Sequence, residues 1–199
     1  MEGVAIDPNP ADRILARLKA ATAAEHAALE QKLELDHLSL ARYRRMLEKL
    51  LGFWRPLEAR LGALEGWAAQ GIDFEARRRV PALEADLRAL DISGSGPDRD
   101  CAHLPPTRSM AEGFGCMYVL EGSTLGARVI SRRLNANLSI TPGSGGRFFH
   151  AHGDRTGEMW QAFGAALTRF AASCDAHGPI VATARATFEA LRSWFDPER

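Results

Sequence analysis

The side chain best placed to bind a metal is that of His26, which lies four residues after Thr22 and three before Leu29. This spacing puts the imidazole on the apolar side of a predicted helix. A neutral imidazole there either hydrogen-bonds a group of the fold or ligates a metal such as haem iron. Position alone favours the first use. Lys19, two turns earlier on nearly the same face, either pairs with an acidic group of a ligand or is an ordinary surface lysine.

A second unusual feature is a glycine-rich stretch inside a predicted helix, where residues 113–134 read GFGCMYVLEGSTLGARVISRRL. The glycines stand at positions 113, 115, 122 and 126. Each one costs the helix about 1 kcal/mol relative to alanine. Gly122 and Gly126 lie one turn apart, so their backbone can approach a flat ligand, and with Ser123 and Thr124 they permit a kink. Close packing between helices explains the glycines equally well. The two hydroxyls either join a water network or bond their own backbone.

The elements that must position these residues are helices. Apolar residues recur at helical spacing almost everywhere, and no stretch alternates as a strand would, so we expect an all-α fold. The expected helices are one capped by Asp12, a long one with an apolar stripe from Tyr43 to Leu64, a shorter one from Pro81, the glycine-rich one from near Ser109 to about Asn135, and two last ones through Trp160 and Phe188. We expect a single domain over residues 1–199, with a flexible N-terminus at 1–10.

The composition excludes several classes of protein. Lys+Arg and Asp+Glu both number 25, so the net charge is zero and the basic excess of a nucleic-acid-binding protein is missing. No apolar run reaches the length of a membrane span and no secretory leader begins the sequence. We therefore expect a cytoplasmic protein without a nucleic-acid or membrane partner.

The cysteines and the remaining histidines suggest no further metal site. Three widely spaced cysteines without a CxxC pair argue against a disulfide framework or a structural zinc site; they are Cys101, Cys116 and Cys174. His150 and His152 form an HxH pair after a glycine-rich turn, but no cluster of cysteines or carboxylates accompanies them. We expect them to be solvated loop residues. The other histidines are expected at polar surface positions; they are His37, His103 and His177.

Two segments resemble the haem oxygenase family. Residues 18–30, LKAATAAEHAALE, resemble its proximal helix, and residues 118–130, YVLEGSTLGARVI, resemble its distal helix. The second segment is most similar to the bacterial branch with an EGS-x-LG motif, which includes the biliverdin-forming enzymes associated with bacterial phytochromes. The similarity extends along most of the chain, including Trp160 and Phe163.

The resemblance implies a single helical domain that holds haem between a proximal helix and a kinked, glycine-rich distal helix. It makes His26 the axial ligand of the iron and Gly122 and Gly126 the distal glycines. Ser123 stands where many relatives carry an aspartate in the distal water network. The residues implied to act in catalysis are Gly122, Ser123 and Gly126, and those implied to bind haem are His26, Lys19, Thr22, Tyr118, Gly122 and Gly126.

The implied reaction uses haem as substrate and prosthetic group at once. Dioxygen and electrons from an external reductase or ferredoxin open the ring, and biliverdin, carbon monoxide and ferrous iron leave. A separate electron-donor protein is required because no nucleotide-binding fingerprint is present. A phytochrome is a further implied partner, as the receiver of biliverdin.

Two other functions remain open at this point. A non-catalytic haem carrier or sensor would need His26 and a pocket but no distal water network. An unrelated helical-bundle enzyme of the thiaminase type would use a carboxylate or a cysteine in its core. Cys116 and Glu121 are its candidates, although the pattern favours Cys116 as a small core residue and Glu121 as a charge on the helix surface.

Overall fold

The computed structural model describes residues 10–33, 38–91 and 100–196, and within them every regular element is a helix. The elements are α1 (Pro10–Leu33), α2 (Leu40–Gly62), the 3-10 turns η2 (Ala68–Gln70) and η3 (Glu75–Arg77), α3 (Val80–Ala89), α4 (Met110–Leu138), the short α5 (Arg147–His150), the turn η4 (Gly153–Arg155), α6 (Thr156–Cys174) and α7 (His177–Trp194). The all-α prediction is confirmed. In this part of the chain no helix combines the length and the hydropathy that a membrane crossing requires.

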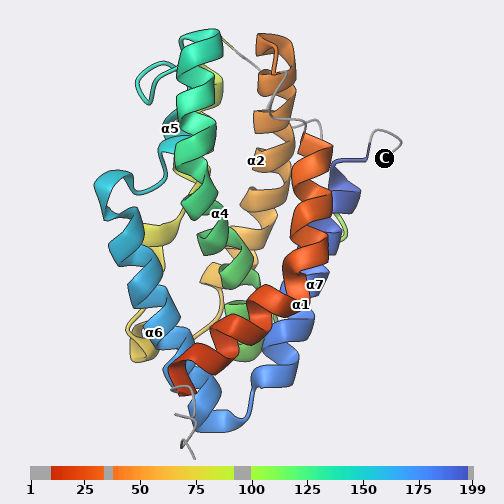
Figure 1. Cartoon of the computed structure of the whole chain (residues 1–199), viewed down its shortest axis with the longest axis vertical. Coiled ribbons are helices and arrows are strands. Elements are labelled where there is room, and N and C mark those ends of the chain that lie inside the picture. Colours follow the sequence, from red (N-terminus) through yellow and green to blue (C-terminus); the bar gives the residue numbers. More distant parts are fainter. Residues whose placement is uncertain (1–9, 34–37, 92–99, 197–199) are drawn as a thin grey trace, which may run out of the picture.

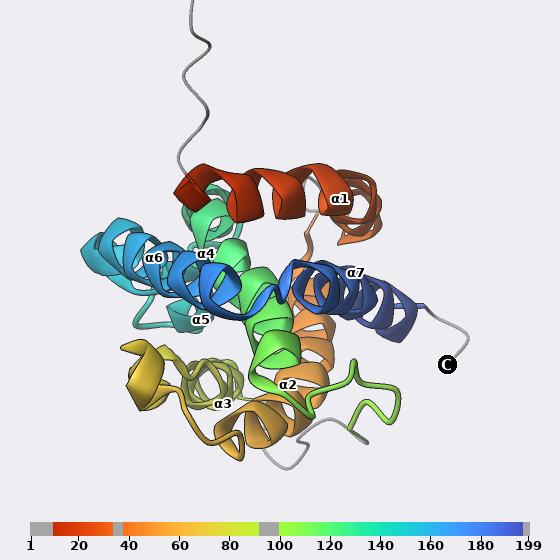
Figure 2. The same ribbon diagram turned by 90° about the horizontal axis from the view of Figure 1, so that it is seen from below.

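The glycine-rich helix α4 is the central element, with α6 and α7 packed along it (Figure 1). Figure 2 shows α1 on one side of the layer formed by α6 and α7, and α2 and α3 on the other. α1 also packs on α6 and α7, and makes far fewer contacts with α4 itself. Helices α1 and α4 both run from bottom to top in Figure 1, and α4 changes direction about halfway along its length. The helices α6 and α7 therefore fix the position of α1 relative to α4, the two helices that carry the candidate site.

Both long central helices begin at a serine cap. Ser39 Oγ accepts a hydrogen bond from Arg42 N at 3.3 Å before α2, and Ser109 Oγ accepts one from Glu112 N at 3.3 Å before α4. Each cap satisfies an N–H group that the helix leaves unpaired and contributes about 1 kcal/mol. The expected start of the glycine-rich helix near Ser109 is confirmed, and the helix ends at Leu138, slightly beyond the expected end.

One hydrophobic core contains side chains from every α-helix. The apolar stripe expected on α2 is buried from Tyr43 to Leu61, and Leu64 packs against the core after the helix has ended. The first helix differs from expectation at its start: α1 begins at Pro10, so Asp12 lies inside the first turn and not at the N-cap position. Residues 1–9 of the expected flexible N-terminus lie outside the described residues, as does His37.

Candidate functional site

Gly113 and Gly115, in the first turns of α4, serve close helix packing. A Cβ atom on Gly113 would lie 2.7 Å from Leu64 Cδ1, and one on Gly115 would lie 2.6 Å from the Ile180 carbonyl oxygen of α7. Real Cβ atoms essentially never come so close to another heavy atom. Close packing, one of the two explanations for the glycines, therefore accounts for these two.

Gly126 faces open space instead, and Gly122 is uncrowded, with one ring at ordinary van der Waals distance. Among the described residues a Cβ on Gly126 would meet no atom within 4 Å, and one on Gly122 would meet only the Trp160 ring, at 3.9 Å. Packing between helices gives no reason for glycine at either position. The alternative explanation, in which a flat ligand approaches the helix backbone closely, is the one that fits this pair of glycines.

The same side of α4 exposes two large apolar side chains. Leu125 is 47% exposed and Val129 is 45% exposed, and both lie within one turn of Gly126 on the helix surface. Large apolar groups that gather on an exposed helix face often mark a binding site. We call Gly122, Leu125, Gly126 and Val129 the glycine face of α4.

His26 lies on α1 with its ring edge against the Phe188 ring of α7, at 5.7 Å between centroids and 79° between planes. Thr22 and Leu29, its neighbours on the stripe, are buried as expected. The imidazole itself is not: its side chain is 55% exposed, so the expectation of a buried imidazole was wrong. Its Nδ1 lies 3.7 Å from Glu30 Oε2, which leaves Nε2 as the nitrogen free to bind a ligand.

A contact between Thr22 and Tyr118 connects α1 to α4. Burial raises the pKa of the Tyr118 phenol, against the opposing effect of a hydrogen bond with the Thr22 side chain. The Tyr118 ring also packs on Trp160 of α6, at 6.0 Å between centroids. His26 follows Thr22 by one turn and Gly122 follows Tyr118 by one turn. Because α1 and α4 run in the same direction (Figure 1), His26 and Gly122 each lie one turn beyond this contact along their own helices.

The hydroxyl groups beside the glycine face bond their own helix. Ser123 Oγ donates to Leu120 O and Thr124 Oγ1 donates to Glu121 O, each at 2.6 Å. Ser123 is exposed, whereas Thr124 is buried. Of the two uses expected for these hydroxyl groups, the structure therefore shows the hydrogen bond to the backbone of the same helix. Each oxygen keeps lone pairs with which it can accept a further hydrogen bond.

Lys19 is exposed on α1, two turns before His26. Cys116 is fully buried, as expected of a core residue, and burial raises the pKa of its thiol to about 12. This thiol is therefore a poor nucleophile at neutral pH, which argues against the bundle-enzyme alternative.

Among the described residues no cluster of three or more histidine, cysteine, aspartate or glutamate side chains is arranged to hold a metal ion.

Glu121 is not the surface charge that we expected. Its side chain is 3% exposed, and its Oε2 lies 2.8 Å from Nη1 of the equally buried Arg77. It belongs to a group of buried charged residues that sequence reasoning missed, namely Glu58, Arg77, Arg79, Asp86 and Glu121. One signal was available: Glu121 lies four residues after Met117 and three before Thr124, and both of these residues are buried.

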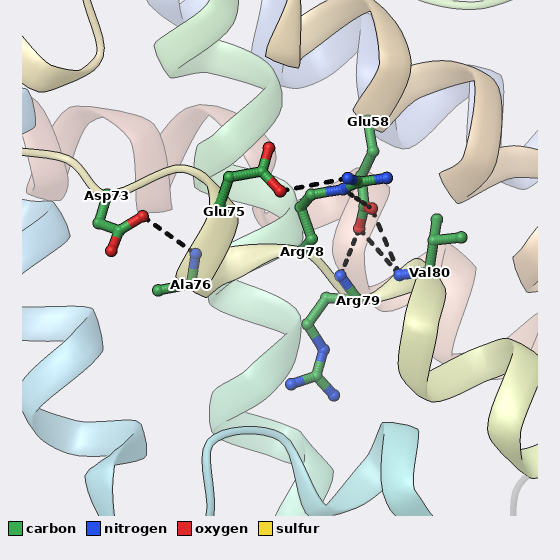
Figure 3. A network of polar contacts seen from close by, with 7 residues as sticks. All are labelled: Glu58, Asp73, Glu75, Ala76, Arg78, Arg79 and Val80. Carbon is green, nitrogen blue, oxygen red and sulfur yellow. Dashed lines mark hydrogen bonds and ion pairs between the residues drawn. The ribbon is translucent and has the colours of Figure 1, made fainter.

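The buried carboxylates of this group hold loop backbone in place. Glu58 of α2 accepts hydrogen bonds from the backbone N–H groups of Arg79 (2.6 Å) and Val80 (3.3 Å), and so caps α3 from a neighbouring helix. Figure 3 shows this cap, with the Arg78 side chain lying across Glu58 and Glu75. Burial raises the pKa of Glu58 and also that of Glu121 above the usual range, and the facing guanidinium groups oppose the shift.

His152 also differs from expectation. His150 is exposed as expected, but it is the last residue of α5 and not a loop residue. His152 is partly buried, and its Nε2 is shielded from solvent without a hydrogen-bond partner. Burial, with the nearby charges of Arg79 and Arg77, lowers the pKa of its imidazole to about 4. His152 is therefore uncharged in the folded protein at neutral pH.

Comparison with known proteins points in one direction. A family model described as "Heme oxygenase" matches residues 12–197 of this chain. The chain is 35% identical, over 162 residues, to a protein named heme oxygenase from Xanthomonas campestris pv. campestris, and the matched region covers 79% of this chain and 91% of the relative.

Solved structures agree. The fold is similar to the NO- and CO-bound heme oxygenase of Neisseria meningitidis, with a TM-score of 0.75, 25% identity and 92% of each chain covered. It is also similar to the heme oxygenase of Leptospira interrogans, with a TM-score of 0.74, 18% identity, and 92% and 98% of the two chains covered. Both matches span almost the whole of the described fold.

Proposed function

Since this chain belongs to the haem oxygenase family, we propose that it binds haem between His26 and the glycine face and cleaves the ring to biliverdin, carbon monoxide and ferrous iron. The single observation that supports this placement best is that the Cβ position of Gly126 is open and that of Gly122 is uncrowded. A methyl group at either position would occupy the space that a flat ring needs, and no neighbouring helix uses that space.

His26 is the proposed iron ligand. Among the described residues its ring packs edge-to-face with Phe188, and its Nδ1 side lies near Glu30, so Nε2 is the nitrogen left for a ligand. The Phe188 contact restricts the orientation of the ring, and Nε2 is the nitrogen that can bind the metal. The exposure of the imidazole in the ligand-free chain is what an axial ligand requires, because the haem itself would cover it.

The glycine face, Thr22 and Tyr118 are proposed to line the ring. Leu125 and Val129 present apolar surface that is exposed to water when haem is absent. Burying such surface against the ring favours binding by about 25 cal/mol per Å². The Thr22–Tyr118 contact lies one turn before His26 on α1 and one turn before Gly122 on α4. Lys19 lies two turns from His26 and is free to approach a propionate at the ring edge.

Haem supplies the dioxygen-binding iron and the carbon that is oxidised, and the protein supplies orientation and proton control. The backbone at Gly122 and Gly126 lets the ring and any water on that side approach α4 closely. Ser123 Oγ donates to Leu120 O, so toward water it acts as an acceptor. We propose that Ser123 helps to order water beside the glycine face in this way.

Electrons would come from a separate donor, a reductase or a ferredoxin. We also propose that the chain is a cytoplasmic, single-domain member of the branch associated with bacterial phytochromes, which would deliver biliverdin to a phytochrome. The EGS-x-LG segment at residues 121–126 supports this finer assignment.

The test is haemin titration followed by addition of an electron donor in air, with catalase present. The parent should form a haem complex and then convert it to biliverdin. His26→Ala should lose the complex, whereas His103→Ala, which removes an exposed histidine elsewhere in the chain, should behave as the parent does. Stable haem binding without turnover in the parent would favour a carrier or sensor, and the absence of any binding would contradict both functions.

A further inference from the structure

One buried arginine connects α4 to α6 directly beneath the candidate site. Arg77 Nη1 lies 2.8 Å from Glu121 Oε2, and the two side chains are 4% and 3% exposed. Nη1 and Nη2 of Arg77 both donate to Met159 O of α6, at 3.2 Å each. A single guanidinium from η3 therefore contacts both helices at once.

Both contacts of Arg77 are one residue away from the candidate site. Glu121 precedes Gly122, and Met159 precedes Trp160. The Trp160 ring is the group nearest to the empty Cβ position of Gly122, at 3.9 Å, and it packs on Tyr118. A shift of Arg77 would therefore move the glycine face and the aromatic group beside it together.

The glycine face cannot fix its own orientation. Gly122 and Gly126 have no side chains to pack, and Leu125 and Val129 point to solvent. The rotation of this part of α4 must be set by its buried residues, which are Leu120, Glu121, Thr124 and Ala127. Thr124 and Ala127 are small, which leaves Leu120 and Glu121 as the long side chains. Of these two, Glu121 forms an ion pair with another element.

Stability alone is a weak reason for such a pair. Removing two charges from water offsets much of their attraction, and apolar pairs of similar size often serve stability equally well. The pair is a close contact between charges and not an aligned hydrogen bond, because Glu121 Oε2 has no hydrogen-bond partner among the described residues. It therefore fixes the distance between η3 and α4, which apolar contacts leave loose. The arrangement therefore suits a role in geometry.

We propose that the Arg77–Glu121 pair positions the glycine face: it sets the rotation of α4 about its own axis and the distance between the glycine face and the haem ring. The inference rests on the proposed function. If the pair is lost, α4 shifts relative to α6, and the ring is held less tightly and in more than one orientation. Since the orientation decides which meso carbon meets the bound oxygen, the mixture of biliverdin isomers changes.

The test uses a double replacement, Arg77→Met with Glu121→Leu, which removes both charges and keeps the volume, so that neither is left buried alone. Arg77→Lys is a second variant, because it keeps the charge but loses the forked contact. Glu58→Gln is the matched control: Glu58 is a buried glutamate that caps α3 and does not contact α4 through its hydrogen bonds. The measurements are the unfolding temperature, the rate of haem dissociation and the isomer distribution of the product.

We expect the double variant to fold, to release haem at least about threefold faster and to change the ratio of product isomers by at least about threefold. Arg77→Lys should shift both values in the same direction. Glu58→Gln should lower the unfolding temperature and leave both unchanged. A folded double variant with the parent's haem dissociation rate and isomer ratio would overturn the positioning role. A parent that binds haem but forms no biliverdin would contradict the proposed function instead, and the dissociation rates would still test the pair.

Discussion

Replacing Gly126 by alanine should stabilise the ligand-free protein and weaken haem binding at the same time. The new methyl group meets no described atom within 4 Å, so it adds no clash to the folded chain. Alanine is better than glycine inside a helix by about 1 kcal/mol, which for a chain of this size raises the unfolding temperature by roughly 2–4 °C.

The same methyl group occupies the space proposed for the ring. Forcing an extra methyl group into a packed contact costs about 1–3 kcal/mol. Haem affinity should therefore fall roughly 5- to 150-fold. Gly122→Ala should behave in the same way, with at least as large a gain in stability, because the new methyl group would lie in ordinary van der Waals contact with the Trp160 ring at 3.9 Å.

Gly115→Ala is the matched control on the same helix. Its Cβ would lie 2.6 Å from Ile180 O and 2.8 Å from Thr183 Cβ, so this variant should unfold at a lower temperature than the parent. Thermal unfolding of the ligand-free proteins and haemin titration at the Soret band measure the two effects. If Gly126→Ala raised the unfolding temperature but bound haem as tightly as the parent, the glycine face would not be a haem contact and the reasoning would fail.

Three further predictions concern side chains around the two helices. The unfolding temperature of the parent should fall between pH 6.5 and pH 4, because the His152 pKa of about 4 in the fold makes the unfolded chain bind more protons there, and His152→Gln should flatten that slope. Lys19→Met should weaken haem binding by roughly 1.5- to 5-fold, the range for an exposed ion pair, and the difference from the parent should shrink in high salt. Phe188→Leu should let haem dissociate roughly 2- to 10-fold faster in stopped-flow transfer to a haem acceptor, because the His26 ring loses an edge-to-face contact worth about 0.5–1.5 kcal/mol; an unchanged rate would show that Phe188 does not hold the imidazole.

Helical periodicity was sufficient for much of the fold. The stripe from Tyr43 to Leu61 and the start of α4 at Ser109 lie where the pattern predicts them, because apolar spacing and caps are local properties of the sequence. The start of α1 was missed, since Pro10 continues the helix before Asp12. A proline is tolerated in a first turn, so a capping residue further along was the wrong signal to follow.

The candidate site could be predicted only in part. The spacing put Gly122 and Gly126 on one face but could not distinguish them from Gly113 and Gly115, because the distinction lies in what other helices bring to each position. The exposure of His26 depends in the same way on neighbours that are distant in sequence.

The buried charges were the largest omission. Glu121 was expected at the surface because a glutamate alone in a helix is usually solvated, and its partner Arg77 lies 44 residues earlier in a short 3-10 turn. Pairing across that distance is a property of the tertiary fold. His152 was misplaced for the same reason, since its burial comes from the packing of η4 near Arg77 and Arg79.

The most direct test of the central claim is a crystal structure of the protein with haemin bound. The account predicts iron bonded to His26 Nε2 and the opposite face of the ring in contact with the backbone of Gly122 and Gly126. Iron bound by another residue, or a ring placed away from the glycine face, would contradict it.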